Sequence, residues 1–138
     1  MDSIVRLDES YAEELAALNR QLIEDEGHSN SMSESQLANR MRGWLRGEYL
    51  CFGIVDDARI VAYSLHKDAG DFYYIRQLFT ARDARNQGLA SKLLAHLETH
   101  VLTGKPIRLE VLVGNTHAQK FYAARGYLAY CHTLVKYV

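Results

Sequence analysis

The segment from Tyr74 to Val101 constrains the fold of this chain more than any other part of the sequence. Residues 75–80 carry the β-branched and aromatic side chains that are typical of a strand. From Leu89 onward, apolar side chains recur instead with the spacing of one helix face. A short polar turn of sequence RNQGLA, residues 85–90, joins the two patterns. The sequence therefore predicts a strand, a tight turn and a helix in succession.

The turn carries the features of a phosphate-binding site. Gly88 and Ala90 are small, so a ligand can approach the backbone closely, and Arg85 adds a fixed positive charge. The first N–H groups of the following helix lack intrahelical partners and lie at the positive end of the helix dipole. Such a helix start binds phosphate, although an ordinary turn into a helix has the same short pattern.

Two better-known phosphate-binding loops do not fit this turn. A Walker loop needs a Gly-Lys-Ser/Thr sequence, which the chain does not contain. A dinucleotide fingerprint needs three glycines early in a βαβ unit, whereas this turn has one glycine, late in the sequence. A different kind of phosphate-containing ligand is therefore expected.

A second pattern follows the first along the chain. Residues 107–113 alternate as in a strand, and Asn115, the pair Phe121-Tyr122 and the pair Gly126-Tyr127 come after them. In this order and spacing, the two patterns resemble the two signatures of the GNAT acetyltransferases, which bind acetyl-coenzyme A. The resemblance covers nearly the whole chain, although the N-terminal third matches only in its pattern of elements.

The expected fold is a mixed α/β (α+β) domain formed by residues 1–138 as a single unit, because 138 residues bury one sizeable core. Capping boxes at Ser10-x-x-Glu13 and Ser33-x-x-Gln36 predict two N-terminal helices, the second ending at Gly47. The resemblance implies a mostly antiparallel, splayed sheet of six to seven strands flanked by about four helices. Strands are predicted at 4–7, 49–55, 59–66, 72–80, 107–113, 127–130 and 133–137, and later helices at 89–101 and 115–124.

The resemblance also implies where acetyl-CoA binds. Its pantetheine arm would lie between two splayed central strands, along Leu78, Phe79 and Thr80 and against Asn115. Asn115 is also expected to be a helix N-cap. The pyrophosphate would bind the turn and the first helical amides. The residues implied there are Arg85, Asn86, Gln87, Gly88, Leu89, Ala90 and Ser91.

Acetyl transfer to an amine needs a base to deprotonate the amine and an acid for the leaving thiolate. Tyr122 matches the position of the family's tyrosine acid, and the alternative is a core aromatic residue. Glu110, on the alternating strand, matches a glutamate that serves as base in some relatives, but this glutamate is widespread in the family without a catalytic role. Gln77 stands where some relatives place an acid, so Glu24, Glu26, His28 or a water chain are other candidate bases.

The acceptor would enter beside the loop between the first two helices. Glu24 and Glu26 in that loop would attract a cationic amine, with His28 nearby, or they are simply a solvated helix end. Tyr74 would line the acceptor cleft, or it is simply one of the aromatic residues that favour strand formation. The acceptor's identity is not encoded in any motif: a polyamine, an aminoglycoside, an amino acid or a protein N-terminus all fit.

Composition and charge limit the partners, the cellular location and the cofactors that the sequence predicts. A formal net charge of −1 gives no reason to expect nucleic acid as a partner, and the longest apolar run is too short to span a membrane. The N-terminus lacks the pattern of a signal peptide, which favours a cytoplasmic location, with Cys51 and Cys131 as two buried thiols. His96 and His100 have metal-ligand spacing but no third ligand, so no metal is expected. A homodimer is compatible with the sequence.

Taken together, these patterns predict an N-acetyltransferase that uses acetyl-CoA as cosubstrate and transfers the acetyl group directly to a primary amine in a ternary complex. Tyr122 favours this enzyme, whereas the missing acid at Gln77 favours a non-catalytic acyl-CoA-binding or regulatory module with the same fold. A purely structural domain would require both signatures to be coincidental.

Overall fold

A five-stranded sheet organises the computed structural model, which describes residues 2–27 and 30–138. The strands lie in the order β1-β2-β3-β4-β5, and all neighbours are antiparallel except β4 and β5, which are parallel. The strands are β1 (Asp2–Leu7), β2 (Tyr49–Asp56), β3 (Arg59–Asp68), β4 (Tyr73–Thr80) and β5 (Ile107–Leu109). The main helices are α1 (Ala12–Asp25), α2 (Glu34–Arg46), α3 (Leu89–His96) and α4 (Thr116–Ala123).

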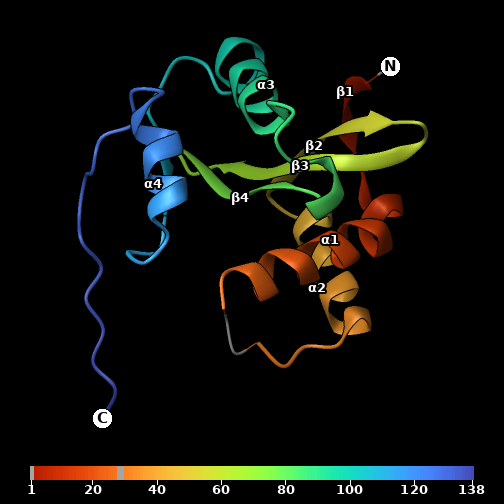
Figure 1. The fold of residues 1–138 in the computed structure, drawn as a ribbon, viewed down its shortest axis with the longest axis horizontal. Coiled ribbons are helices and arrows are strands. Elements are labelled where there is room, and N and C mark those ends of the chain that lie inside the picture. The colour runs from red at the N-terminus through yellow and green to blue at the C-terminus, as the bar shows by residue number, and fades with distance from the viewer. Residues whose placement is uncertain (1, 28–29) are drawn as a thin grey trace.

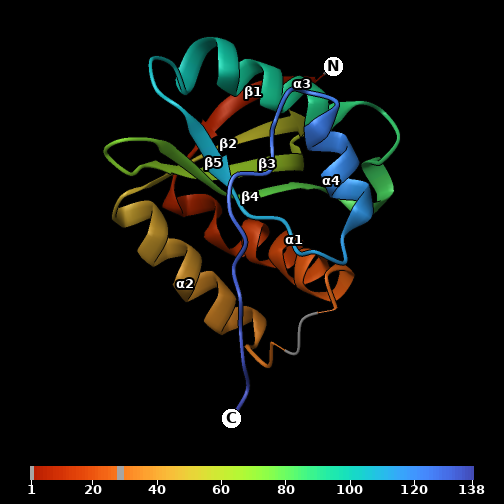
Figure 2. The ribbon, with the colours of Figure 1, turned by 90° about the vertical axis from the view of Figure 1, so that its left-hand side faces the viewer.

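Helices cover both faces of the sheet (Figures 1 and 2). Helices α1 and α2 lie against one face, α3 lies against the other, and α4 stands beside the end of β4. Leu15, Met41 and Leu93, from α1, α2 and α3 respectively, are fully buried in one core with Tyr63 of β3. None of the helices in the described residues is long and apolar enough to cross a membrane.

The two predicted capping boxes have different outcomes. At α2 the box forms as predicted: the Gln36 amide donates to Ser33 Oγ at 3.1 Å and the Ser33 amide donates to Gln36 Oε1 at 2.8 Å. At the first helix the prediction is wrong, because Asp8 accepts from both the amide and the hydroxyl of Ser10 and caps a 3₁₀ turn, Glu9–Tyr11. Helix α1 therefore begins only at Ala12.

Strands β2, β3 and β4 form the predicted pair of hairpins, with one irregularity that affects the site. Along β3, the neighbouring residues Leu65 and His66 pair with Gln77 and Ile75, so Arg76 is an extra residue in β4. Such a β-bulge bends the strand and redirects its side chains. The bulge lies just before residues 78–80, which were predicted to contact acetyl-CoA.

The parallel pair at the sheet edge is short, and this separates β4 from the following chain. Only residues 73–75 of β4 pair with β5, although the sequence predicted a strand over 107–113. From Arg76 to Thr80, the β5-facing edge of β4 has no strand beside it among the described residues. Beyond Ile75, β4 and the chain after β5 therefore separate, but the predicted strand over 107–113 is wrong beyond Leu109.

The prediction of six to seven strands is wrong: the sheet of the described residues has five. Residues 127–138 contain no strand and extend away from the sheet (Figure 1). Apolar side chains there are exposed, including Leu128 at 89% and Leu134 at 90%. A strand forms only when its backbone groups hydrogen-bond to a neighbouring strand, and this segment pairs with none, although Tyr130 contacts Arg108 of β5. For the same reason Cys131 is exposed, which corrects the expectation of two buried thiols, whereas Cys51 is buried.

Candidate active site

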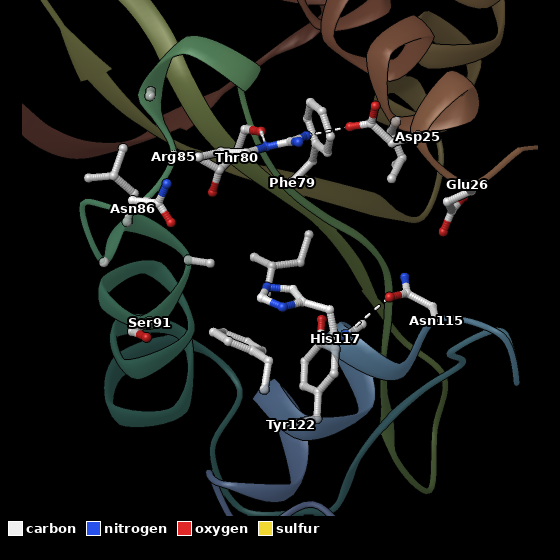
Figure 3. Close-up of a pocket in the computed structure, with 18 of the residues that line it drawn as sticks. Asp25, Glu26, Phe79, Thr80, Arg85, Asn86, Ser91, Asn115, His117 and Tyr122 are labelled. Atoms are coloured by element: carbon white, nitrogen blue, oxygen red, sulfur yellow. Dashed lines mark hydrogen bonds and ion pairs between the residues drawn. The ribbon is translucent and has the colours of Figure 1, made fainter.

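A cavity of about 840 Å³ opens where β4 and the chain after β5 separate (Figure 3). Its walls come from the end of α1, the end of β4, the turn into α3, and the start of α4. The lining residues are Leu22, Asp25, Glu26, Leu78, Phe79, Thr80, Ala84, Arg85, Asn86, Gly88, Leu89, Ala90, Ser91, Leu112, Gly114, Asn115, His117, Ala118, Phe121 and Tyr122. Every residue predicted to hold acetyl-CoA except Gln87 is among them.

The backbone of the turn into α3 has a positive φ at residue 88, a conformation that favours glycine. Gly88, with φ of 72°, is the N-cap of α3 in the left-handed region, and Asn86 is also left-handed with φ of 64°. No described side chain caps the helix, so its first N–H groups remain available at the cavity wall. A β-carbon added to Gly88 would meet no atom within 4 Å, which leaves open space above the turn.

Arg85 is engaged by an acid that the sequence did not indicate. Its guanidinium group donates to Asp25 at the end of α1 and to the Thr80 carbonyl at 3.3 Å (Figure 3). Burial raises the pKa of Asp25, but hydrogen bonds from Arg85 and Arg82 outweigh burial and hold that pKa below its ordinary value. The pair ties the turn to α1 and fixes the Arg85 side chain across one end of the cavity.

Tyr122 projects from α4 into the cavity from the opposite side (Figure 3). Its ring makes edge contacts with Phe121 and Tyr127, with centroids 5.1 and 5.5 Å away. Burial raises the pKa of Tyr122 to about 12, against a weaker opposing effect of Arg125. The hydroxyl has no hydrogen-bond partner among the described residues, so it is a protonated donor available to a ligand.

Asn115 and His117 complete the α4 side of the cavity. Asn115 is the N-cap of α4, because its Oδ1 accepts from the Ala118 amide at 3.1 Å, and its side-chain NH₂ remains a possible donor to a ligand. His117 was not predicted from the sequence, yet its imidazole ring lies in the middle of the cavity near Tyr122 (Figure 3). Its position in the first turn after Asn115, one turn ahead of Phe121, is the only signal that could have identified it.

The predicted base, Glu110, does not line this cavity. It follows β5 directly and accepts a hydrogen bond of 2.7 Å from the Tyr74 hydroxyl. Burial, and then the bond to Glu110, raise the pKa of Tyr74 to about 12. The structure thus brings these two predicted site residues together as one hydrogen-bonded pair, separate from the cavity that Tyr122 lines.

The acids that were predicted in a loop lie partly in a helix: Glu24 and Asp25 are the last residues of α1, and both are paired with an arginine. Glu24 and Asp25 accept from Arg82, at 2.8 and 3.0 Å, and Glu24 does not line the cavity. Glu26 does line it. His28, also predicted to contact the acceptor, lies outside the described residues.

The two histidines with metal-ligand spacing pack against each other. The rings of His96 and His100 have centroids 5.1 Å apart. Within the part of the chain that the structure describes, no three His, Cys, Asp or Glu side chains gather in a way that could hold a metal ion.

Known proteins share this fold and part of this sequence. The structure superposes on an aminoglycoside N-acetyltransferase in complex with CoA, with a TM-score of 0.80, 14% identity, and coverage of 100% of this chain and 95% of the other. A ribosomal-protein-alanine N-acetyltransferase from Brucella melitensis gives 0.78 and 14%, with 99% of each chain covered. An integron cassette protein from Vibrio cholerae gives 0.79 and 19%, covering 99% of this chain and 91% of the other. No curated protein sequence matches the chain.

The sequence itself carries the family assignment. The family model described as the acetyltransferase (GNAT) family matches residues 11–127, which include the turn at Gly88, Asn115 and Tyr122. The low-identity structural matches show the same fold independently. The chain therefore belongs to the GNAT family of acetyltransferases.

Proposed function

We propose that this protein is an N-acetyltransferase that moves an acetyl group from acetyl-CoA to a primary amine by direct transfer in a ternary complex. One observation carries the proposal: a single cavity joins the uncapped start of α3 to the protonated Tyr122 hydroxyl. A phosphate site and a proton donor facing the same space suit a cosubstrate with a pyrophosphate at one end of its arm and a thioester at the other.

The chemistry of the cavity fits acetyl-CoA. The first N–H groups of α3 are donors for a pyrophosphate, at the positive end of the helix dipole. The backbone of Leu78 to Thr80 lies at the unpaired edge of β4, where a pantetheine amide would complete its hydrogen bonds. The Asn115 amide group can donate from the opposite wall. Bound acetyl-CoA would supply the activated acetyl group.

Tyr122 is proposed as the general acid. When the amine attacks the thioester carbonyl, a C–N bond forms, the C–S bond breaks, and the sulfur takes a proton. Tyr122 stays protonated at neutral pH because its pKa is about 12, so its hydroxyl can donate to the developing thiolate. The acceptor loses a proton, and Glu110 remains our proposed base for it, acting through water because it does not line the cavity.

The alternative is a module that binds acyl-CoA without catalysis. Gln77 favours it, because its Oε1 accepts from the Tyr63 hydroxyl at 2.8 Å and so makes a structural contact where some relatives carry an acid. The module would retain the α3 phosphate site and would release no CoA thiol.

We also propose that the protein acts as a homodimer. The outer edge of β5 pairs with no strand among the described residues, and the apolar side chains of residues 128–138 are largely exposed, although Tyr130 contacts Arg108 of β5. Pairing of that segment with the β5 edge of a second copy would satisfy both at once.

Turnover with thiol detection tests the proposal. The protein is mixed with acetyl-CoA and a panel of amines comprising polyamines, aminoglycosides, amino acids and short peptides, and the release of CoA thiol is measured. We expect amine-dependent release with at least one class. Calorimetric binding of acetyl-CoA without release for any class would favour the module, and absence of binding would contradict both readings.

A further inference from the structure

Two arginine side chains from different elements meet on one indole ring, outside the cavity described above. The guanidinium carbon of Arg40, in α2, lies 4.5 Å from the ring centroid of Trp44. The guanidinium carbon of Arg76, in β4, lies 4.7 Å from the same centroid. Tyr49 also packs against Trp44, with its ring centroid 5.8 Å from that of Trp44.

The β-bulge explains how Arg76 reaches this position. Arg76 is the extra residue of β4 between Ile75 and Gln77, so it departs from the regular alternation of the strand. Both Gln77, which bonds to Tyr63, and Arg76, which contacts Trp44, consequently face the α1 and α2 side of the sheet. The bulge thus adds one basic side chain to this face, beside the splayed part of β4.

The two guanidinium groups lack carboxylate partners. Among the described residues, neither Arg40 nor Arg76 forms an ion pair, whereas Arg42, Arg82 and Arg85 all do. Arg40 donates to Asn19 Oδ1 at 2.9 Å, but its buried Nε has no hydrogen-bond partner. Burial, and then repulsion by Arg76, lower the pKa of Arg40. Two neighbouring cations with a buried donor left over favour an anion at this place.

The arginine pair lies beside the proposed reaction site. Arg76 lies two positions before Leu78, where β4 begins to line the cavity, and Tyr74, two residues before Arg76, bonds to Glu110. Arg40 also bonds to Asn19 of α1, and Leu22 and Asp25 of the same helix line the cavity. An acceptor whose amine reaches the cavity could therefore place a second group on the arginines.

We propose that Arg40 and Arg76 bind an oxyanion of the acceptor, so that the substrates are amines that also carry a carboxylate or a phosphate. This inference rests on the proposed function and deepens it by naming a substrate class. Planar guanidinium groups bind both oxyanions through paired hydrogen bonds, and Arg is suited to this role. The resulting acceptor is zwitterionic, with its amine toward the cavity and its anion toward Trp44.

The only tryptophan of the chain gives a binding test that does not depend on turnover. Trp44 fluorescence is followed while ω-amino carboxylates of three to six carbons, their primary amides, and ω-aminoalkyl phosphates of matched length are added. We expect saturable changes with carboxylates or phosphates and an affinity at least about tenfold lower for the amides, as charge-assisted hydrogen bonds predict. Equal responses to acid and amide, or no response to any of them, would overturn the inference.

Substitutions of the two arginines distinguish a loss of anion binding at this site from a general loss of folding. Arg76→Gln should abolish the preference for the anion, and Arg40→Lys should weaken it because a lysine lacks the planar fork. Arg42→Gln, in the same helix but paired with Glu13, is the matched control and should keep the preference. Thermal unfolding and acetyl-CoA affinity confirm that each variant is folded. An unchanged preference in Arg76→Gln would contradict the site.

Kinetics then distinguish the inference from the proposed function. If amines are acetylated, the acid-bearing acceptors should have a KM about tenfold or more below that of their amides, and Arg76→Gln should raise that KM with little change in kcat. If oxyanion binding is observed by fluorescence but no amine is acetylated, the site stands and the enzymatic proposal fails. If amines are acetylated without preference for acceptors that carry an anion, the enzymatic proposal stands and the oxyanion site fails.

Discussion

The environment of single side chains decides what each group can do in this protein. The Tyr122 phenol is held in a T-shaped aromatic cluster, and its burial keeps it protonated, with a pKa of about 12. The same residue in an exposed position would be an ordinary tyrosine. Its proposed function as an acid depends on the cavity, which gives a ligand access to the hydroxyl.

Removal of the Tyr122 hydroxyl should slow the chemical step. Tyr122→Phe keeps the ring contacts, so we expect kcat to fall by about 10²–10⁴-fold while acetyl-CoA affinity stays within about twofold. Steady-state and single-turnover kinetics measure this. Tyr127→Phe, in the same ring cluster but bonded to Glu98, serves as the control. A wild-type rate in Tyr122→Phe, with chemistry limiting, would assign the residue to the core.

His66 should make the folded protein sensitive to mild acid. It is buried on β3, stacked on Phe52 and 3.4 Å from the Ser64 hydroxyl, and burial lowers its pKa to about 4. Because the folded state resists a proton that the unfolded state accepts below about pH 6.5, stability falls as the pH drops from 6.5 to 4. A shift of this size corresponds to about 3 kcal/mol.

Denaturant unfolding at several pH values tests this dependence. His66→Phe should flatten the slope between pH 6.5 and 4, and His132→Gln, in the exposed C-terminal segment, should not. The carboxyl groups of Asp8, Asp25 and Asp68 have pKa values below the ordinary 3.8, so loss of their contribution is confined to lower pH. An unaltered slope in His66→Phe would mean that another group takes up the proton.

At the scale of elements, the turn into α3 is held from two sides. Asp25, at the end of α1, binds Arg85, and Arg125, after α4, donates to the Ser91 hydroxyl of α3. These contacts fix the uncapped helix start relative to both walls of the cavity. The turn is therefore positioned before any ligand arrives, which lowers the entropy that binding would cost.

A side chain and a negative charge at the turn should block the cosubstrate. Gly88→Glu introduces both at the start of α3, so we expect acetyl-CoA affinity by calorimetry to fall at least about 100-fold. The substitution also costs about 1–2 kcal/mol of folding stability because φ is positive there. Gly104→Glu imposes a similar strain at φ of 93°, away from the cavity, and should retain binding. Full affinity in a folded Gly88→Glu protein would exclude this phosphate site.

At the scale of the whole molecule, the C-terminal segment leaves the fold incomplete at one edge. Besides Leu128 and Leu134, the side chains of Tyr137 and Val138 are almost fully exposed, and β5 offers an open edge. An open edge and an exposed apolar segment favour association between copies.

We expect a homodimer whose association depends on this segment. Light scattering at micromolar concentration should give twice the chain mass, and Leu134→Asp should shift the protein toward the monomer because it places a charge in the contact. Lys136→Gln, in the same segment, keeps the apolar residues and should remain dimeric. A wild-type monomer at all concentrations would contradict the dimer and would favour pairing of the segment with its own sheet.

Much of the fold follows from short-range patterns in the sequence. The capping box at Ser33, the hairpins of β2, β3 and β4, the tight turn into a helix at Gly88 and the N-cap at Asn115 all depend on residues within a few positions of one another. Their physical causes are local dihedral preferences and side chain to backbone hydrogen bonds, so the sequence alone determined them. The cavity residues of the turn were implied instead by the resemblance to the GNAT signatures.

Only the tertiary structure decided which distant groups meet. Arg85 is bound by Asp25, sixty residues away, and Arg76 joins Arg40 on Trp44 through a bulge that no local pattern indicated. His117 became a site residue because α4 turns that face toward the cavity. The last two predicted strands did not form, because residues 127–138 pair with no other strand and β-propensity alone does not complete a strand's hydrogen bonds. Such outcomes depend on how the elements pack in space, which is a property of the whole chain.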